Sequence, residues 1–254
     1  SNIETITGNA DDDAVTLLTA ITGGVINLGA ATGGDTLVLA NGTNSATVSG
    51  VETLTGGTGA DTITLATTLT GVTVNLGAGT DSLTLGNFAN TGTVSNVETL
   101  TGNADDDIIT LGAAAVSATI DLAGGTDELR LGNFTNSLTI SNVEDLTGGT
   151  ANDTVTLATA LADMALNLRT GTDTLTLANV TNTGTLSNVE VINGGTGADT
   201  ITLATNVAGA IINLGAGTDS ITFATGTNSA TLSNVETVTG TSGASTITFA
   251  AAVT

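Results

Sequence analysis

The chain of 254 residues contains no proline, cysteine, histidine, tryptophan or tyrosine, and only four phenylalanines. With so few aromatic side chains, any core must be thin and filled by Val, Ile, Leu and Ala. The lack of cysteine and histidine removes the sulfur and nitrogen ligands on which zinc and copper sites depend. Lysine is absent as well, so no ordinary general base or activated nucleophile exists, and we expect no enzymatic activity.

Positive charge is also scarce. Arg130 and Arg169 stand against 24 acidic residues, which gives a net charge of −22. Because phosphate binding needs Lys and Arg, we expect no nucleic-acid partner, and an anionic membrane surface is equally unsuitable. No run approaches 18 consecutive apolar residues, so the sequence predicts no insertion into a membrane.

What the chain does contain is periodic. The tripeptide Asn96-Val97-Glu98 returns at intervals of 46 residues as Asn142-Val143-Glu144, Asn188-Val189-Glu190 and Asn234-Val235-Glu236. A fixed period of this size predicts a solenoid, a propeller or a repeat array. Two versions of one glycine-rich turn, residues 57–61 and 77–81, divide the unit. We therefore interpret the unit as a double coil of about 23 residues per coil, with about eleven coils in the chain.

Within a coil, apolar and polar residues alternate as in β-strands. Val72, Val74 and Leu76 are expected to face inward, as are Leu83 and Leu85 after the turn at residues 77–81. No segment has the spacing of an amphipathic helix. The sequence thus predicts an all-β fold, a parallel β-solenoid that runs as one continuous domain over residues 1–254. Because the repeat shows no obvious capping segment, we expect an excerpt of a longer repeat protein.

An aspartate closes most of the glycine-rich turns, and we expect these aspartates to form one column at one corner of the solenoid. Neighbouring carboxylates one strand spacing apart would repel by about 3–4 kcal/mol at an effective dielectric constant of about 20, which calls for a cation. Oxygen-only ligands favour Ca²⁺. The predicted metal ligands are Asp13, Asp35, Asp61, Asp81, Asp107, Asp127, Asp153, Asp173, Asp199 and Asp219.

Two further columns of residues recur with the 46-residue period. One is a column of asparagines, which we expect to form an amide ladder in a turn on the opposite edge: Asn44, Asn90, Asn136, Asn182 and Asn228. The other is the glutamate of the Asn-Val-Glu tripeptide, which we interpret as a solvated face, with additional ion binding as the alternative. Turn formation alone is the alternative explanation for the aspartate column, although it does not explain why acids fill it instead of asparagine.

Residues 56–64 (GGTGADTIT) and 194–202 (GGTGADTIT) resemble the glycine-rich nonapeptide of RTX, or haemolysin-type, calcium-binding proteins. The resemblance implies a parallel β-roll in which Ca²⁺ lies between successive turns, held by the motif's aspartate and by backbone carbonyls. Its best-matched ligands are Asp61, Asp81, Asp199 and Asp219. It also implies folding on Ca²⁺ binding after type I secretion. Several turns depart from the motif, and Ser245 replaces the aspartate of the last one.

These observations favour a calcium-stiffened structural segment of a large secreted bacterial surface protein, such as an S-layer subunit, an adhesin or an extracellular filament. Such a segment would be extracellular, with Ca²⁺ as its cofactor and with end-to-end or lateral contacts to other copies. A different class of function is ice or surface binding, since Thr-x-Thr pairs such as Thr62/Thr64 and Thr200/Thr202 would form outward arrays. A third alternative is the secretion module of an exoenzyme.

Overall fold

The computed structural model describes residues 4–29 and 34–250, which form 27 β-strands and no helix. Within those ranges, no helix is therefore long and apolar enough to cross a membrane. Contacts divide the chain into two compact units, Ser1–Leu129 and Arg130–Thr254, each of which is described by itself. The expectation of a single continuous solenoid over residues 1–254 stays a prediction.

The first unit contains fourteen strands, the last of which ends one residue beyond it. They are β1 (Thr5–Asn9), β2 (Ala14–Thr16), β3 (Gly24–Gly29), β4 (Thr36–Val38), β5 (Ser45–Ser49), β6 (Thr53–Gly57), β7 (Thr62–Leu65), β8 (Thr70–Gly77), β9 (Ser82–Thr84), β10 (Thr91–Ser95), β11 (Thr99–Asn103), β12 (Ile108–Leu111), β13 (Val116–Ala123) and β14 (Glu128–Arg130).

The second unit contains the other thirteen. They are β15 (Ser137–Ser141), β16 (Asp145–Thr147), β17 (Thr154–Leu157), β18 (Ala162–Asn167), β19 (Thr174–Thr176), β20 (Thr183–Ser187), β21 (Val191–Gly195), β22 (Thr200–Leu203), β23 (Ala208–Gly215), β24 (Ser220–Thr222), β25 (Ser229–Ser233), β26 (Thr237–Thr239) and β27 (Thr246–Phe249).

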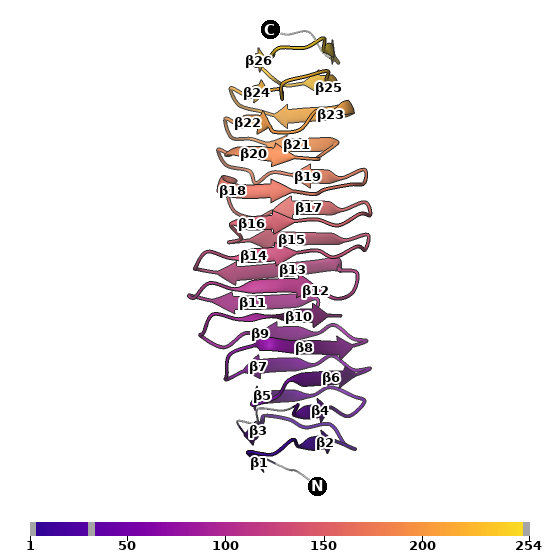
Figure 1. Ribbon diagram of the computed structural model, residues 1–254, viewed down its shortest axis with the longest axis vertical. Helices are drawn as coiled ribbons and strands as arrows, with labels where there is room; N and C mark the ends of the chain where they lie inside the picture. Colours follow the sequence, from indigo (N-terminus) through magenta and orange to yellow (C-terminus); the bar gives the residue numbers. More distant parts are fainter. Residues whose placement is uncertain (1–3, 30–33, 251–254) are drawn as a thin grey trace. The chain divides into compact units, whose positions relative to one another are not determined.

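In each unit the strands form two parallel sheets, one of odd-numbered and one of even-numbered strands, stacked in chain order (Figure 1). In the first unit, for example, β5 pairs with β7 and β7 with β9, while β4 pairs with β6 and β6 with β8, all in parallel. Two successive strands therefore make one turn of a solenoid. The predicted all-β parallel β-solenoid is confirmed, with about a dozen turns where about eleven were expected.

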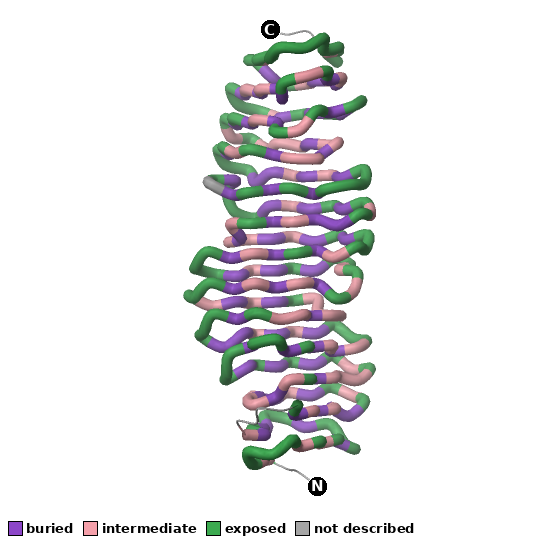
Figure 2. The backbone as a smooth tube through the Cα atoms, viewed as in Figure 1, coloured by how far each residue is buried: buried purple, intermediate pink, exposed green. Residues whose placement is uncertain are grey.

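The core lies between the two sheets and is as thin as the composition requires. Burial alternates along the strands (Figure 2). The five residues expected to point inward, Val72, Val74, Leu76, Leu83 and Leu85, are all buried. Thr73 and Thr84 between them are not. Because each strand contributes at most three apolar side chains to its layer, polar groups at the strand ends lie close to the core.

Each turn of the solenoid has two corners, at the connections between successive strands. The odd corner is the connection that leads into an odd-numbered strand, and the even corner is the one that leads into an even-numbered strand. Asn44 lies at the odd corner before β5, and Asn90, one sequence repeat later, lies at the even corner before β10. Five strands separate them, which is two and a half turns. Equivalent residues of consecutive 46-residue repeats therefore lie at opposite corners.

The tripeptide Asn96-Val97-Glu98 forms one of the tightest corners. It connects β10 to β11, and Asn96 has a φ of 53°, in the left-handed region that asparagine and glycine adopt most readily. Gly50 fills the same place before Val51-Glu52 with a φ of 59°. The Asn96 amide nitrogen also donates to Asn75 Oδ1 at 2.7 Å in the preceding turn. The tripeptide is thus a turn with a fixed geometry.

Candidate functional site

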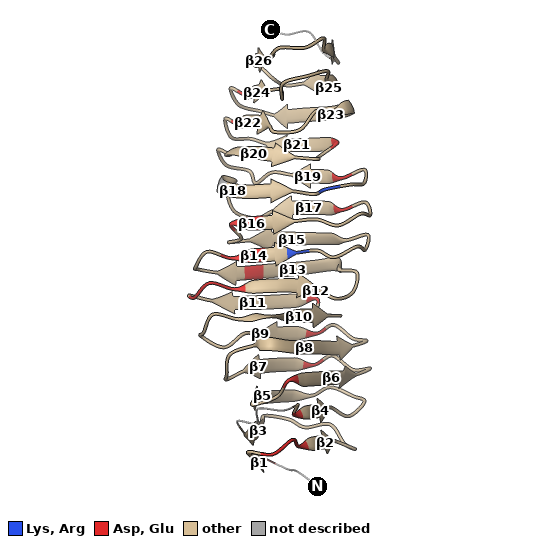
Figure 3. Cartoon of the chain, viewed as in Figure 1, with Lys and Arg blue, Asp and Glu red and all other residues tan. Residues whose placement is uncertain are grey.

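Four polar residues, Asn, Asp, Asp and Glu, occupy successive turns at one corner and are joined by hydrogen bonds. We call each such set a ladder. The structure contains complete or partial ladders at both corners (Figure 3, acidic residues in red): Asn44–Asp61–Asp81–Glu98 and Asn136–Asp153–Asp173–Glu190 at the odd corner, and Asp13–Asp35–Glu52, Asn90–Asp107–Asp127 and Asn182–Asp199–Asp219–Glu236 at the even corner.

The hydrogen bonds of one ladder run in a single direction. The Asn44 N–H donates to Asp61 Oδ1 at 2.8 Å, and the Asp61 N–H donates to Asp81 Oδ1 at 2.7 Å. The Asp81 N–H then donates to Glu98 Oε2 at 2.7 Å. The steps span 17, 20 and 17 residues. Each side chain thus satisfies a backbone donor that would otherwise be buried without a partner.

Asparagine begins a ladder because it can donate from its side chain as well. The Asn182 amide nitrogen lies 2.9 Å from the Ala178 carbonyl oxygen, 2.7 Å from that of Val180 and 2.8 Å from Asp199 Oδ1. An apolar residue one turn earlier donates its N–H to the asparagine Oδ1, as Leu161 does to Asn182 at 3.0 Å. The asparagine is therefore fully satisfied inside the turn.

The aspartates are buried but only half satisfied. Asp61, Asp81, Asp173 and Asp199 have at most 1% of their surface exposed. Eight aspartates have an Oδ2 atom that is inaccessible to solvent and has no hydrogen-bond partner in the described chain: Asp35, Asp61, Asp81, Asp127, Asp153, Asp173, Asp199 and Asp219. A buried carboxylate oxygen without a donor is unfavourable unless a proton or a cation compensates its charge.

The pKa values follow from this environment. The pKa of Asp173 is raised to about 6, mainly by burial; the backbone hydrogen bond from Asp153 opposes the rise, and the charges of Asp153 and Glu190 contribute to it. Burial is also the main cause that raises the pKa of Asp81, Asp107, Asp153 and Asp219 above the usual 3.8. Burial in the ladders therefore disfavours the ionised form of these five aspartates.

The predicted single column of ten aspartates is wrong in its arrangement. Asp61, Asp81, Asp153 and Asp173 lie at the odd corner, whereas the other six lie at the even corner: Asp13, Asp35, Asp107, Asp127, Asp199 and Asp219. They come in consecutive pairs and do not form one file, because 46 residues span two and a half turns. Asp13 is only half-buried, and its Oδ2 accepts the Asn9 N–H at 3.0 Å.

Two other interpretations from the sequence need correction. The asparagines do not stack on one another on an opposite edge. Four of them donate to the aspartate of the next turn at the same corner, as Asn90 does to Asp107, and Asn228 donates to Ser245 in the same way. The glutamates are not merely a solvated face, because Glu52, Glu98, Glu190 and Glu236 each accept an aspartate N–H. The sequence did contain a signal for the position of the glutamates. Gly50 stands in place of the asparagine, which marks a left-handed turn two residues before Glu52.

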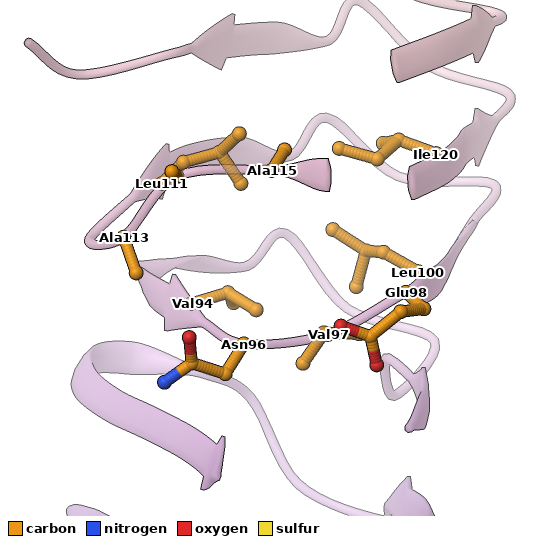
Figure 4. Close-up of a pocket in the computed structure, with 10 residues that line it drawn as sticks. Val94, Asn96, Val97, Glu98, Leu100, Leu111, Ala113, Ala115 and Ile120 are labelled. Atoms are coloured by element: carbon orange, nitrogen blue, oxygen red, sulfur yellow. The ribbon is translucent and has the colours of Figure 1, made fainter. Parts of the chain in front are cut away.

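A small cavity interrupts the apolar packing beside one ladder. The cavity lies between β10, β12 and β13 (Figure 4). Its volume is about 10 Å³, near the lower limit for one water molecule. Ala115 lines it together with Leu111 and Ile120. Ala115 directly precedes β13, at the position before an asparagine ladder where Leu69 and Leu161 are fully buried elsewhere. The shorter side chain therefore leaves this space.

The ladders offer only oxygen ligands, which suits Ca²⁺, and the unpartnered Oδ2 atoms suit a cation. Within residues 4–29 and 34–250, however, no group of three or more acidic side chains is close enough to hold a metal by itself. A bound ion would need backbone carbonyls or water in addition to one or two carboxylates. No protein-family model, curated protein or solved structure matches the chain.

Proposed function

We propose that the chain is a calcium-binding structural segment of a large secreted surface protein, such as an S-layer subunit, an adhesin or an extracellular filament. The observation that carries the proposal is the set of eight buried Oδ2 atoms without a hydrogen-bond partner. With a net charge of −22 and two arginines in the sequence, neutralisation from solution is required. The resemblance of residues 56–64 and 194–202 to RTX repeats supports Ca²⁺ as the cation.

The role proposed for the ion is to stabilise the fold. Without it, paired aspartates such as Asp61 and Asp81 face each other across one strand spacing, which costs about 3–4 kcal/mol per ionised pair at an effective dielectric constant of about 20. Binding Ca²⁺ at these oxygens would convert binding free energy into folding free energy. The segment would then be loosely folded where Ca²⁺ is scarce and stiff outside the cell, where it is abundant.

The test is a calcium titration of the chain after treatment with EGTA. Circular dichroism reports folding, and equilibrium dialysis with elemental analysis counts the bound ions. We expect saturable Ca²⁺ binding together with a rise in the midpoint of thermal unfolding. An unchanged midpoint and no bound ion at millimolar Ca²⁺ would show that the proposal is wrong.

A second candidate is ice or surface binding, which the register of one sheet favours. Thr47, Thr64, Thr84 and Thr101 are successive partners on β5, β7, β9 and β11, so their outward side chains form a regular column. A parallel column runs through Ser45, Thr62, Ser82 and Thr99. Thermal hysteresis of the intact chain, absent from a Thr64→Lys variant, would establish this function, and no hysteresis in either would exclude it.

Self-association is part of the proposal because strands at the ends of the sheets have one unpaired side. In the described part of the chain these are β1, β2, β26 and β27. Unpaired strand edges are templates for pairing with another chain. Sedimentation velocity over a range of protein concentrations, with and without Ca²⁺, measures whether copies associate.

A further inference from the structure

In four ladders the final glutamate is clamped to the second aspartate by two hydrogen bonds. The Asp81 N–H donates to Glu98 Oε2 at 2.7 Å, and the Glu98 N–H donates back to the Asp81 carbonyl oxygen at 3.0 Å. The same reciprocal pair joins Asp35 to Glu52, Asp173 to Glu190 and Asp219 to Glu236. The glutamate side chain is therefore folded back over the turn that holds the aspartate.

The backbone holds the glutamate in this position. Asn96, two residues before Glu98, has a φ of 53°, and Asn188 and Asn234 adopt the same conformation before Glu190 and Glu236. The valine between the left-handed residue and the glutamate is buried at three of the four corners, as Val51, Val189 and Val235, and Val97 is half-buried. A left-handed turn anchored by a buried side chain leaves the glutamate little freedom, so its carboxylate is pre-organised beside the aspartate.

Each clamp joins two acidic residues of neighbouring turns with no compensating charge in the ladder. Asp35, Asp81, Asp173 and Asp219 are at most 1% exposed, and the Oδ2 atom of each has no hydrogen-bond partner. Burial is the main cause that raises the pKa of Asp81, and the charges of Asp61 and Glu98 add to it. The ladder itself contains no cationic side chain that could neutralise such a pair.

The Asp–Glu step is also the step of a ladder that solvent can reach. Asp61 and Asp81 are both fully buried, whereas Glu52, Glu98 and Glu190 are partly exposed and Glu236 is exposed. An ion arriving from water must shed its hydration shell gradually, and a half-exposed carboxylate next to a buried one permits this. The Asp–Asp step offers no such path.

We infer that each Asp–Glu step is a divalent-cation site in which the glutamate is the outer ligand and the unpartnered Oδ2 of the buried aspartate is the inner ligand. The four sites are Asp35–Glu52, Asp81–Glu98, Asp173–Glu190 and Asp219–Glu236. Backbone carbonyls and water complete the coordination of a Ca²⁺ ion, which takes six to eight oxygens. This inference rests on the proposed function and adds to it glutamates that the glycine-rich motif does not contain.

The test replaces three glutamates by glutamine in the full chain, as Glu98→Gln, Glu190→Gln and Glu236→Gln together. Glutamine keeps an oxygen that accepts the aspartate N–H, so the clamp remains while three negative charges are lost. The matched control removes three exposed carboxylates outside the ladders, Asp11→Asn, Asp105→Asn and Asp145→Asn. Both variants change the net charge by the same amount, so non-specific attraction of cations changes equally.

Bound Ca²⁺ is counted by equilibrium dialysis, and affinity is measured by titration calorimetry, with circular dichroism as the check on folding. We expect the glutamine variant to lose three ions per chain or to bind them at least about tenfold more weakly. The control should bind as the original chain does. If the glutamine variant is poorly folded, Asp81→Asn, Asp173→Asn and Asp219→Asn together remove the inner ligands, and the same loss is expected.

The outcomes separate this inference from the proposed function. Calcium binding by the original chain that both glutamine and control variants retain in full would overturn the glutamate ligands and leave the proposed function standing. An original chain that binds no Ca²⁺ would overturn both. Equal losses in the glutamine variant and the control would show general electrostatic attraction in place of defined sites, which also contradicts the inference.

Discussion

Replacing Asp173 by asparagine is expected to stabilise the calcium-free chain. Asp173 is fully buried, its Oδ1 accepts the Asp153 N–H at 2.7 Å, and its Oδ2 has no partner. Asparagine retains the oxygen that accepts this bond and brings no charge. Asn182, at the even corner, shows that an asparagine amide can donate to the carbonyls of its own turn.

The magnitude follows from the pKa of Asp173, which burial raises to about 6 from the usual 3.8. A folded-state pKa above the unfolded value means that the folded chain binds the proton more tightly. The stability this gives is complete below pH 3.8 and is lost as the pH rises through about 6. At 1.36 kcal/mol per pKa unit, the loss at neutral pH is about 3 kcal/mol, and Asp173→Asn should recover it.

The assay is urea denaturation in EGTA at pH 4 and pH 7.5, followed by circular dichroism, with Asp105→Asn as an exposed control. We expect Asp173→Asn to raise the free energy of unfolding at pH 7.5 by up to about 3 kcal/mol and to flatten its dependence on pH. In saturating Ca²⁺ the gain should shrink, because the variant lacks an ion ligand. Destabilisation at pH 7.5 in EGTA, or an unchanged pH dependence, would falsify the reasoning.

Three other substitutions test the packing of the ladders, each by the free energy of unfolding in urea. Asn90→Asp places a carboxylate oxygen where the amide donates to Asp107 Oδ1 at 2.8 Å, and should destabilise by about 3–5 kcal/mol; a smaller effect than 1 kcal/mol would contradict the ladder. Ala115→Val should fill the adjacent cavity, as Val207 does at the equivalent position, and stabilise by about 1 kcal/mol, whereas destabilisation would show that the space is already closed. Gly77→Ala should destabilise by at least about 2 kcal/mol, because φ is 93° and the added methyl group would lie 2.2 Å from the Gly57 carbonyl oxygen. Unchanged stability would refute that close approach.

The strands and their inward residues could be predicted from the sequence because alternation has a direct physical cause. Val72, Val74 and Leu76 face inward in β8 for the reason expected, since successive side chains of a strand point to opposite sides. The turn at residues 77–81 also connects β8 to β9 as predicted.

The distribution of aspartates between the corners could not be predicted, because the sequence period does not show how many turns one repeat spans. Asn96-Val97-Glu98 looks like strand continuation by composition, yet its left-handed asparagine makes it a corner. Counting that corner adds half a turn per repeat and moves Asp107 to the corner opposite Asp61. The partners of the buried oxygens depend on register between turns, which the linear pattern does not contain.

The half-integral number of turns in a repeat limits how such a chain can lengthen or shorten. Duplication or deletion of one 46-residue unit would transfer every downstream strand from one sheet to the other and carry its outward side chains to the far side of the molecule. Only changes of two units restore the original faces. A function that depends on one face would therefore tolerate the gain or loss of two 46-residue units at a time. A function carried by both faces would tolerate the gain or loss of a single unit.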